Sequence, residues 1–107
     1  MEKRKFERYE YSFRVLYKKV KSLFWMKKAC TGNISRGGLK LKLKRAVPIG
    51  TILRVMIFNP FLNEPIEAEA EVVWINRNDH RPIWSAGLSF VHMRWTDSDR
   101  LLYGVSQ

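Results

Sequence analysis

Residues 39–44 read Leu-Lys-Leu-Lys-Leu-Lys, so apolar and charged side chains alternate with a period of two. Successive side chains of an extended strand point to opposite faces, and this segment would place leucines on one face and lysines on the other. Residues 67–72 alternate in the same way, with glutamates between small apolar residues. Both segments therefore predict strands with one buried face, and the glutamates predict a solvated face beside no cleft.

The same strand signal recurs in four other segments, at residues 10–18, 24–34, 51–58 and 83–93. Turn-forming residues separate the segments, at positions 35–38, 48–50, 59–60 and 76–79. Short connections favour antiparallel neighbours, and closing six strands into a barrel removes the exposed edges of the sheet. We therefore expect an all-β fold, a six-stranded antiparallel β-barrel over residues 10–94.

A helical pattern is confined to the C-terminal end of the chain. Thr96 and Asp99 have the spacing of a capping box at a helix N-terminus. Leucines follow at 101 and 102, and Gly104 favours the end of a helix. We expect one short C-terminal helix over residues 96–103, beside the barrel.

The chain has 107 residues, which suits a single domain with one core. Its net charge of +10 is unevenly distributed, because residues 1–54 hold 16 Lys and Arg with 3 acidic residues, whereas residues 55–107 hold 4 and 7. A basic half favours an anionic partner, such as nucleic acid, an anionic membrane surface, a nucleotide or an acidic protein. For most of these lysines a solvated surface is the simpler interpretation.

Several classes of protein are disfavoured by residue usage. The single cysteine, Cys30, cannot form an internal disulfide, which fits a reducing compartment. The chain has no apolar run of 18 residues, and its charged N-terminus lacks the apolar stretch of a signal peptide. His80 and His92 have no second ligand at metal-binding spacing, and no catalytic set of residues is evident. We expect a cytoplasmic protein that is not an enzyme, with no metal site and no membrane span.

Two short motifs stand out from this background. Arg4 and Arg8 lie four residues apart in a charged segment before the first predicted strand. Asn33, Ser35 and Gly38 lie in the predicted turn between the second and third strands. Taken singly, a charged arm and a turn rich in Asn, Ser and Gly are both common without any ligand.

Together, and in this order, the motifs resemble the RxxxR and (D/N)xSxxG motifs of the PilZ family. Residues 47–51, 71–74 and 87–90 are also similar to the family's turn into its fourth strand, its fifth strand and its Gly-x-x-Phe strand, so the resemblance covers nearly the whole chain. Two positions depart from the common pattern. Lys3 stands where the family often has a second arginine, and Asn33 is the rarer of the two accepted residues.

The resemblance implies a bacterial receptor domain that binds cyclic di-GMP as a ligand and needs no cofactor. By this carry-over the binding residues are Arg4, Arg8, Asn33, Ser35 and Gly38. Lys5, Arg36 and Gly37 are candidates of second rank. The implied partner is a protein of flagellar motor, polysaccharide synthase or regulator type.

The residues suit that ligand on chemical grounds. Arginine can take guanine O6 and N7 in a bidentate pair, or hold a phosphate. Gly38 would allow close approach to the backbone or a positive φ angle. Residues 1–8 of the N-terminal arm, residues 1–9, contain one large apolar side chain, Phe6, and too little apolar surface to offset the entropy of ordering. We therefore expect this arm to be flexible when free and to become ordered on the bound nucleotide.

Three alternatives concern partners and ligand. The apolar residues 23–26 form a candidate partner surface, although core packing is the favoured role for at least two of the four. A small basic nucleic-acid-binding barrel would use its aromatic residues for stacking, at positions 6, 9, 11, 13 and 17. The period-two spacing of the last four favours a core instead, so nucleic acid is the weaker hypothesis. A PilZ-like protein-interaction domain that has lost its ligand is the third reading.

Overall fold

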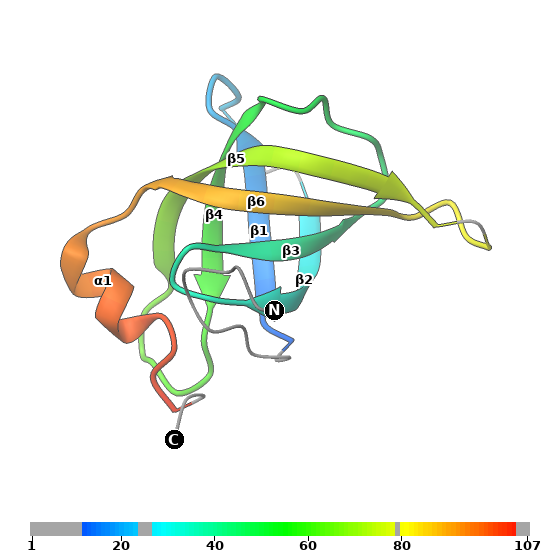
Figure 1. Cartoon of the computed structure of the whole chain (residues 1–107). Coiled ribbons are helices and arrows are strands. Elements are labelled where there is room, and N and C mark those ends of the chain that lie inside the picture. Colours follow the sequence, from blue (N-terminus) through cyan, green and yellow to red (C-terminus); the bar gives the residue numbers. More distant parts are fainter. Residues whose placement is uncertain (1–11, 24–26, 79, 105–107) are drawn as a thin grey trace, which may run out of the picture.

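The computed structural model describes residues 12–23, 27–78 and 80–104, and it places six strands and one helix there (Figure 1). The strands and the helix have the following bounds: β1 Arg14–Lys19, β2 Lys27–Ile34, β3 Gly38–Leu43, β4 Ile52–Phe58, β5 Ile66–Arg77, β6 Trp84–His92 and α1 Trp95–Arg100. The strands pair in the ring order β1-β2-β3-β6-β5-β4, and every pairing is antiparallel. Because β4 also pairs with β1, the barrel is closed, and the predicted six-stranded architecture is confirmed.

The barrel is filled by one face of each alternating strand. Leu39, Leu41 and Leu43 are buried, while Lys42 between them is exposed. The first strand follows the same rule, because Phe13, Val15 and Tyr17 are all buried. The prediction that these aromatic residues belong to the core is confirmed, whereas Tyr9 and Tyr11 lie outside the described residues. Burial raises the pKa of the Tyr17 phenol, since the ionised form would lose its hydration.

A bulge interrupts the regular pairing of β5 with β6. Val72 lies opposite Leu88, but Trp74 lies opposite Gly87, so Val73 is an extra residue in β5. The shift brings both Val73 and Trp74 to the outside of the barrel, where they are 46% and 37% exposed. Strict alternation after the buried Val72 would turn Trp74 inward, and the bulge places it at the surface instead.

The C-terminal helix differs at both ends from the predicted one, residues 96–103. It spans Trp95–Arg100, and its N-cap position is Arg94, which makes no side-chain capping hydrogen bond. The expected capping box of Thr96 and Asp99 is therefore wrong. The reason is Asp97, whose buried carboxylate accepts hydrogen bonds from the guanidinium groups of Arg94 and Arg100, both at 3.1 Å.

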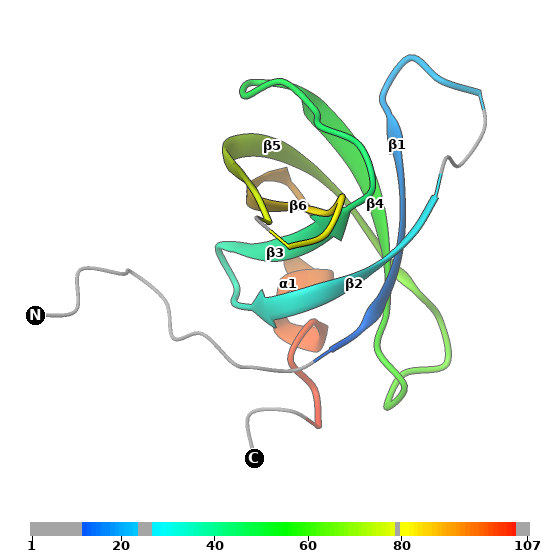
Figure 2. The same ribbon diagram turned by 90° about the vertical axis from the view of Figure 1, so that its right-hand side faces the viewer.

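The end of the helix is attached to the barrel. Asn59, which follows β4, donates from its Nδ2 to the carbonyl oxygens of Leu101 at 3.1 Å and Tyr103 at 3.0 Å. Leu101 is buried in the core, and Gly104 ends the segment with a φ of +79°. The turn between β2 and β3 lies at the same end of the barrel as α1 (Figures 1 and 2). At six residues, α1 is too short to cross a bilayer, and no other helix occurs in the described part of the chain.

Candidate functional site

The β2–β3 turn is held by hydrogen bonds of Ser35. Its backbone N–H donates to the Gly38 carbonyl at 2.9 Å, and its hydroxyl accepts from the Gly37 N–H at 3.1 Å. The hydroxyl also lies 3.4 Å from the Gly38 carbonyl oxygen, to which it donates. The neighbouring strand joins in, because Phe90 N–H donates to the Gly37 carbonyl at 2.9 Å. The turn is therefore a fixed part of the barrel wall.

Gly38 begins β3 at a point of close contact with β6. A Cβ added there would overlap the Leu88 carbonyl oxygen and lie 3.0 Å from the Leu88 carbonyl carbon. Its φ angle is not positive; among the described glycines, positive φ occurs at Gly50 and Gly104. Of the two alternatives expected for Gly38, close approach of the ligand or a positive φ, the second is excluded, and the structure shows a close approach by the neighbouring strand β6.

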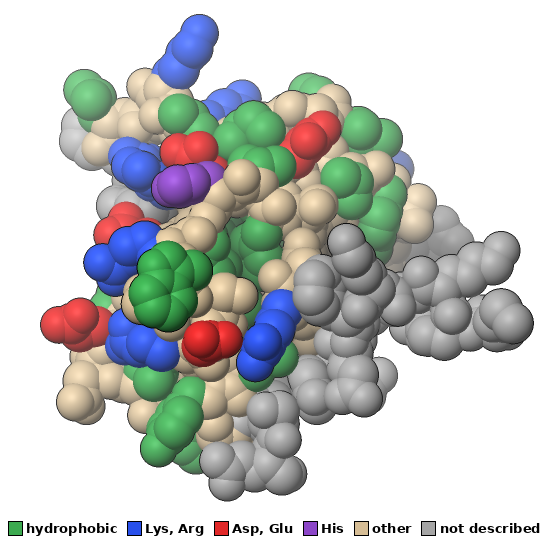
Figure 3. Space-filling view, turned by 60° about the vertical axis from the view of Figure 1, so that its left-hand side comes forward, with side chains coloured by type: hydrophobic (Ala, Val, Ile, Leu, Met, Phe, Trp, Pro, Cys, Tyr) green, Lys and Arg blue, Asp and Glu red, His purple; other side chains and the backbone are tan. Residues whose placement is uncertain are grey.

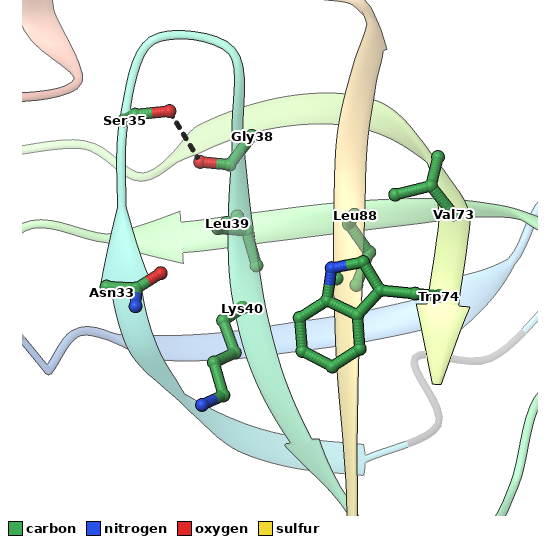
Figure 4. A pocket seen from close by; sticks show the side chains of 9 residues that line it. Asn33, Ser35, Gly38, Leu39, Lys40, Val73, Trp74 and Leu88 are labelled. Carbon is green, nitrogen blue, oxygen red and sulfur yellow. Dashed lines mark hydrogen bonds between the residues drawn. The ribbon is translucent and has the colours of Figure 1, made fainter. Parts of the chain in front are cut away.

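A pocket of about 150 Å³ opens on the outer face of the barrel beside this turn (Figure 4). Its lining comes from β2, β3, β5 and β6: Asn33, Ser35, Gly38, Leu39, Lys40, Val73, Trp74, Gly87 and Leu88. The structure thus brings together Asn33, Ser35 and Gly38, the three predicted site residues that it describes. Arg4, Lys5 and Arg8 lie outside the described residues, so their place is not part of this geometry.

The sequence prediction missed six of the nine pocket residues, and among these Lys40 carries a charge and Trp74 an aromatic ring. Figure 4 shows Asn33 and Lys40 on one side of the pocket and the Trp74 indole on the other. The indole covers Gly87, where a Cβ would overlap its ring atoms. The signal that could have revealed Trp74 is the pair of consecutive apolar residues before it, which breaks the alternation of β5 and indicates the bulge.

The arrangement suits a planar base with an attached anion. The half-exposed indole of Trp74 offers a face for stacking, and the Asn33 amide offers a donor and an acceptor. The Lys40 ammonium adds a positive charge. Pockets for drug-sized ligands span roughly 300–1,000 Å³, so a dinucleotide would extend well beyond this pocket. A search of the described residues finds no group of His, Cys, Asp and Glu that could hold a metal ion.

Arg36, in the turn, is not among the residues that line the pocket. Its guanidinium forms an ion pair with Asp99 of α1, with 3.5 Å between Nη1 and Oδ1. Both side chains are more than half exposed, so the pair is open to exchange with other charged groups. The second-rank candidates therefore have separate places: Gly37 binds β6 through its carbonyl, and Arg36 links the turn to the helix.

A larger hollow of about 520 Å³ lies on the side of the barrel that carries α1 (Figure 3). Its charged lining is mixed: Arg54, Glu64, Glu67, Glu69, His92, Arg94 and Asp97. The expectation that Glu67 and Glu69 lie beside no cleft is wrong, because both line this hollow together with His92, at the end of β6, and Arg94, before α1. The hydrogen bond and charge of Asp97 raise the pKa of the Arg94 guanidinium, and Glu64 and Glu67 act in the same direction. With four carboxylates against two guanidiniums, this hollow disfavours phosphate groups.

The closed barrel, the turn of Asn33, Ser35 and Gly38, and the short C-terminal helix define a PilZ-type domain. The model of the PilZ domain family matches residues 2–106, and the chain belongs to this family. PilZ domains are non-catalytic receptors that generally bind cyclic di-GMP.

Solved structures share the fold at low sequence identity. MotI/DgrA, the inhibitor of motility of Bacillus subtilis, superposes with a TM-score of 0.80 and 22% identity over 97% of this chain and 50% of that chain. The PilZ domain of YcgR from Escherichia coli, solved with cyclic di-GMP, superposes with a TM-score of 0.72 and 13% sequence identity. The match covers 97% of this chain and 89% of that chain. A tetrameric PilZ protein of Xanthomonas campestris superposes with a TM-score of 0.55 and 21% sequence identity. The match covers 75% of this chain and 43% of that chain. The chain thus spans half the length of MotI/DgrA, and the search of curated proteins finds no match.

Proposed function

We propose that this chain is a cyclic di-GMP receptor that folds its N-terminal arm over the bound nucleotide and passes the signal to a protein partner. The observation that carries the proposal is the pocket in which Asn33, Ser35 and Gly38 meet the Trp74 indole. The three residues predicted from the sequence motif thus line the pocket that the structure forms. Family membership supplies the ligand class.

Each pocket residue has a role in this proposal. Trp74 stacks on one guanine, and the Asn33 amide hydrogen-bonds the edge of a base. Lys40 faces a phosphate. Ser35 and Gly38 act mainly through shape, because the Ser35 hydroxyl is already engaged with the turn and Gly38 keeps β3 against β6.

The small size of the pocket supports a contribution from the arm. A dinucleotide that extends beyond about 150 Å³ leaves phosphates and a second base at the surface. Arg4 and Arg8 carry forked guanidiniums that match both groups, and their contacts offset the entropy of ordering the arm. The ordered arm and the nucleotide then form a new composite surface for a partner. The lone cysteine supports a reducing, cytoplasmic setting.

The partner surface is proposed to include α1. Arg36 joins the nucleotide turn to Asp99, so a nucleotide that draws Arg36 toward a phosphate would release the helix from the turn. A flagellar motor component, a polysaccharide synthase and a second regulator all remain candidate partners by family resemblance. A nucleic-acid role is disfavoured because Phe13 and Tyr17, two of the aromatic residues it would need for stacking, are buried.

Calorimetric titration with cyclic di-GMP tests the proposal, with GTP and cyclic di-AMP as control ligands. We expect saturable binding of cyclic di-GMP alone. Asn33→Ala should weaken it, whereas Lys42→Ala, at an exposed position on the same strand as Lys40, should leave it unchanged. If folded protein gave no binding heat with cyclic di-GMP, the receptor proposal would be wrong. The chain would then be a PilZ-like protein-interaction domain that has lost its ligand. A loss of orders of magnitude between 50 and 200 mM salt would instead indicate contact with many phosphates, as in nucleic-acid binding.

A further inference from the structure

Two loops lie at the end of the barrel away from α1. One follows β1 and includes residues 20–23, and the other joins β3 to β4 through residues 44–51 (Figures 1 and 2). The strand register brings them close, because Lys19 at the end of β1 lies opposite Leu53 near the start of β4. This end of the barrel is remote from the nucleotide turn, which contacts α1 through Arg36.

The charges at this end are almost all positive. No Asp or Glu occurs anywhere between residues 11 and 63 of the sequence, which hold twelve Lys and Arg. Lys19 and Lys21 are exposed on the first loop, and Lys44 and Arg45 on the second. Glu71 lies opposite Ile52 in the neighbouring strand and is outnumbered by these four cations.

Aliphatic side chains stand exposed among the cations. Leu23 is 87% exposed and Ile49 is 63% exposed, and Val20 beside them is 46% exposed. The backbone holds both loops in tight turns: Ser22 N–H donates to the Lys19 carbonyl at 2.9 Å, and Thr51 N–H donates to the Pro48 carbonyl at 3.1 Å. These aliphatic side chains are therefore presented at the surface by defined turns.

We propose that this loop end, formed by Lys19, Lys21, Leu23, Lys44, Arg45 and Ile49, docks on the surface of an anionic lipid bilayer. Exposed cations around aliphatic side chains match both layers of such a surface, the phosphates and the acyl boundary. Leu and Ile have no flat face for stacking on bases, so the same charges are less suited to nucleic acid. Residues 24–26 lie outside the described part of the chain, and the proposal does not rest on them.

The proposal goes beyond nucleotide binding and is compatible with it. The nucleotide pocket lies by the β2–β3 turn, and the loop end lies at the other end of β2 and β3. A domain docked through Leu23 and Ile49 would keep the pocket and α1 directed away from the bilayer. The nucleotide signal would then be delivered to a partner at the membrane surface.

Vesicle flotation with the full chain tests the proposal directly. The probes are vesicles of phosphatidylcholine alone and vesicles with 30% phosphatidylglycerol, a fraction of roughly one anionic lipid in three. We expect partition into the anionic vesicles at 50 mM NaCl, little into the neutral ones, and a marked loss at 500 mM NaCl because salt screens exposed charges. Equal partition into both vesicle types, or none into either, would overturn the proposal.

Paired variants locate the contact. Lys19→Gln with Lys21→Gln should lower the partition coefficient about 25-fold, since each Lys or Arg near an anionic surface contributes about fivefold. The charge-matched control, Arg14→Gln with Arg94→Gln, lies at the end of the barrel that carries α1 and should change it little. Leu23→Ser with Ile49→Ser should reduce partition roughly tenfold. Its control, Val91→Ser with Trp95→Ser, removes exposed apolar side chains near α1 and should have no such effect. If the control variants and the loop variants reduce partition into anionic vesicles equally, the loop end is not a specific docking site.

The two other anionic classes are measured in parallel. Single-stranded RNA and poly-L-glutamate serve as probes of nucleic acid and of an acidic protein. One of these probes could bind tightly through Leu23 and Ile49 while the chain fails to bind anionic vesicles. That result would overturn the lipid proposal and make nucleic acid or an acidic protein the partner of the loop end. Binding of anionic vesicles that is lost on changing Leu23 and Ile49 supports the proposal.

Discussion

Arg36 and Asp99 form an ion pair of 3.5 Å that connects the β2–β3 turn to the C-terminal helix. The two residues are 63 positions apart in the sequence, and the barrel brings them to the same end of the molecule (Figure 1). The turn and the strand ends beside it carry Asn33, Ser35 and Gly38 of the proposed nucleotide site. The pair is therefore a direct physical connection between the candidate site and the helix.

This pair gives a prediction about competition for Arg36. If the nucleotide draws the Arg36 guanidinium toward a phosphate, Asp99→Asn should raise the affinity for cyclic di-GMP by about 1.5- to 5-fold, since exposed ion pairs contribute about 0.2–1 kcal/mol. Calorimetry on the variant measures this change. In an Arg36→Ala background the same substitution should have no effect. Weaker binding by Asp99→Asn would mean that Asp99 positions Arg36 for the ligand.

Gly38→Val should damage both the fold and the site. The added side chain would collide with the backbone of Leu88, which belongs to the adjacent strand and cannot move away cheaply. We expect a loss of about 1–3 kcal/mol in the free energy of unfolding, measured by denaturant titration, together with loss of nucleotide binding. Ser35→Ala removes hydroxyl contacts of 3.1 and 3.4 Å within the turn and should cost less stability. Wild-type stability in Gly38→Val would refute the tight contact with β6.

Trp74 is predicted to be a stacking platform. Trp74→Ala should lower cyclic di-GMP affinity by about 5- to 150-fold, because stacking of a base on an aromatic residue contributes roughly 1–3 kcal/mol. Trp74→Phe keeps a flat face and should retain most of the affinity. The side chain is 37% exposed and lies outside the core, so both variants should fold, as circular dichroism can verify. Equal affinities of the alanine and phenylalanine variants would exclude stacking.

Tyr17 predicts a specific pH dependence of stability. Its pKa is raised in the folded protein by burial, so above the ordinary value of about 10 the unfolded chain loses the phenol proton first. The folded state then binds more protons than the unfolded state, and stability must fall as pH rises through this window. Tyr17→Phe should show a shallower alkaline decline than wild type in denaturant titrations. Identical slopes would show that the phenol ionises as readily in the barrel as in the unfolded chain.

The sequence predicted the barrel well because its strands obey a local rule. The Leu-Lys alternation of residues 39–44 places each side chain on one of two faces, and the structure buries the leucines as expected. The three described candidates Asn33, Ser35 and Gly38 line one pocket, because the motif lies within and beside one turn. The predictions failed where distant residues determine the outcome. The buried Asp97 displaced the expected helix cap, and the bulge in β5 delivered Trp74 to the pocket.

We propose above all that a bound nucleotide orders the N-terminal arm, residues 1–9, over the barrel. Lys3, Arg4, Lys5 and Arg8 are all trypsin cleavage sites. Loss of the N-terminal peptide, followed by mass spectrometry, should be fast without ligand and strongly slowed by saturating cyclic di-GMP. GTP should have little effect, and cleavage at the exposed Lys21, remote from the nucleotide turn, serves as the internal control.

The same measurement on Arg4→Ala and Arg8→Ala connects protection to binding. Each variant should fold as wild type does, bind cyclic di-GMP much more weakly, and lose the protection of the remaining arm sites. For the wild-type chain, we expect cyclic di-GMP to slow cleavage at the arm and to leave cleavage at Lys21 unchanged. Equal arm cleavage rates with and without cyclic di-GMP, in protein saturated with nucleotide, would contradict this expectation.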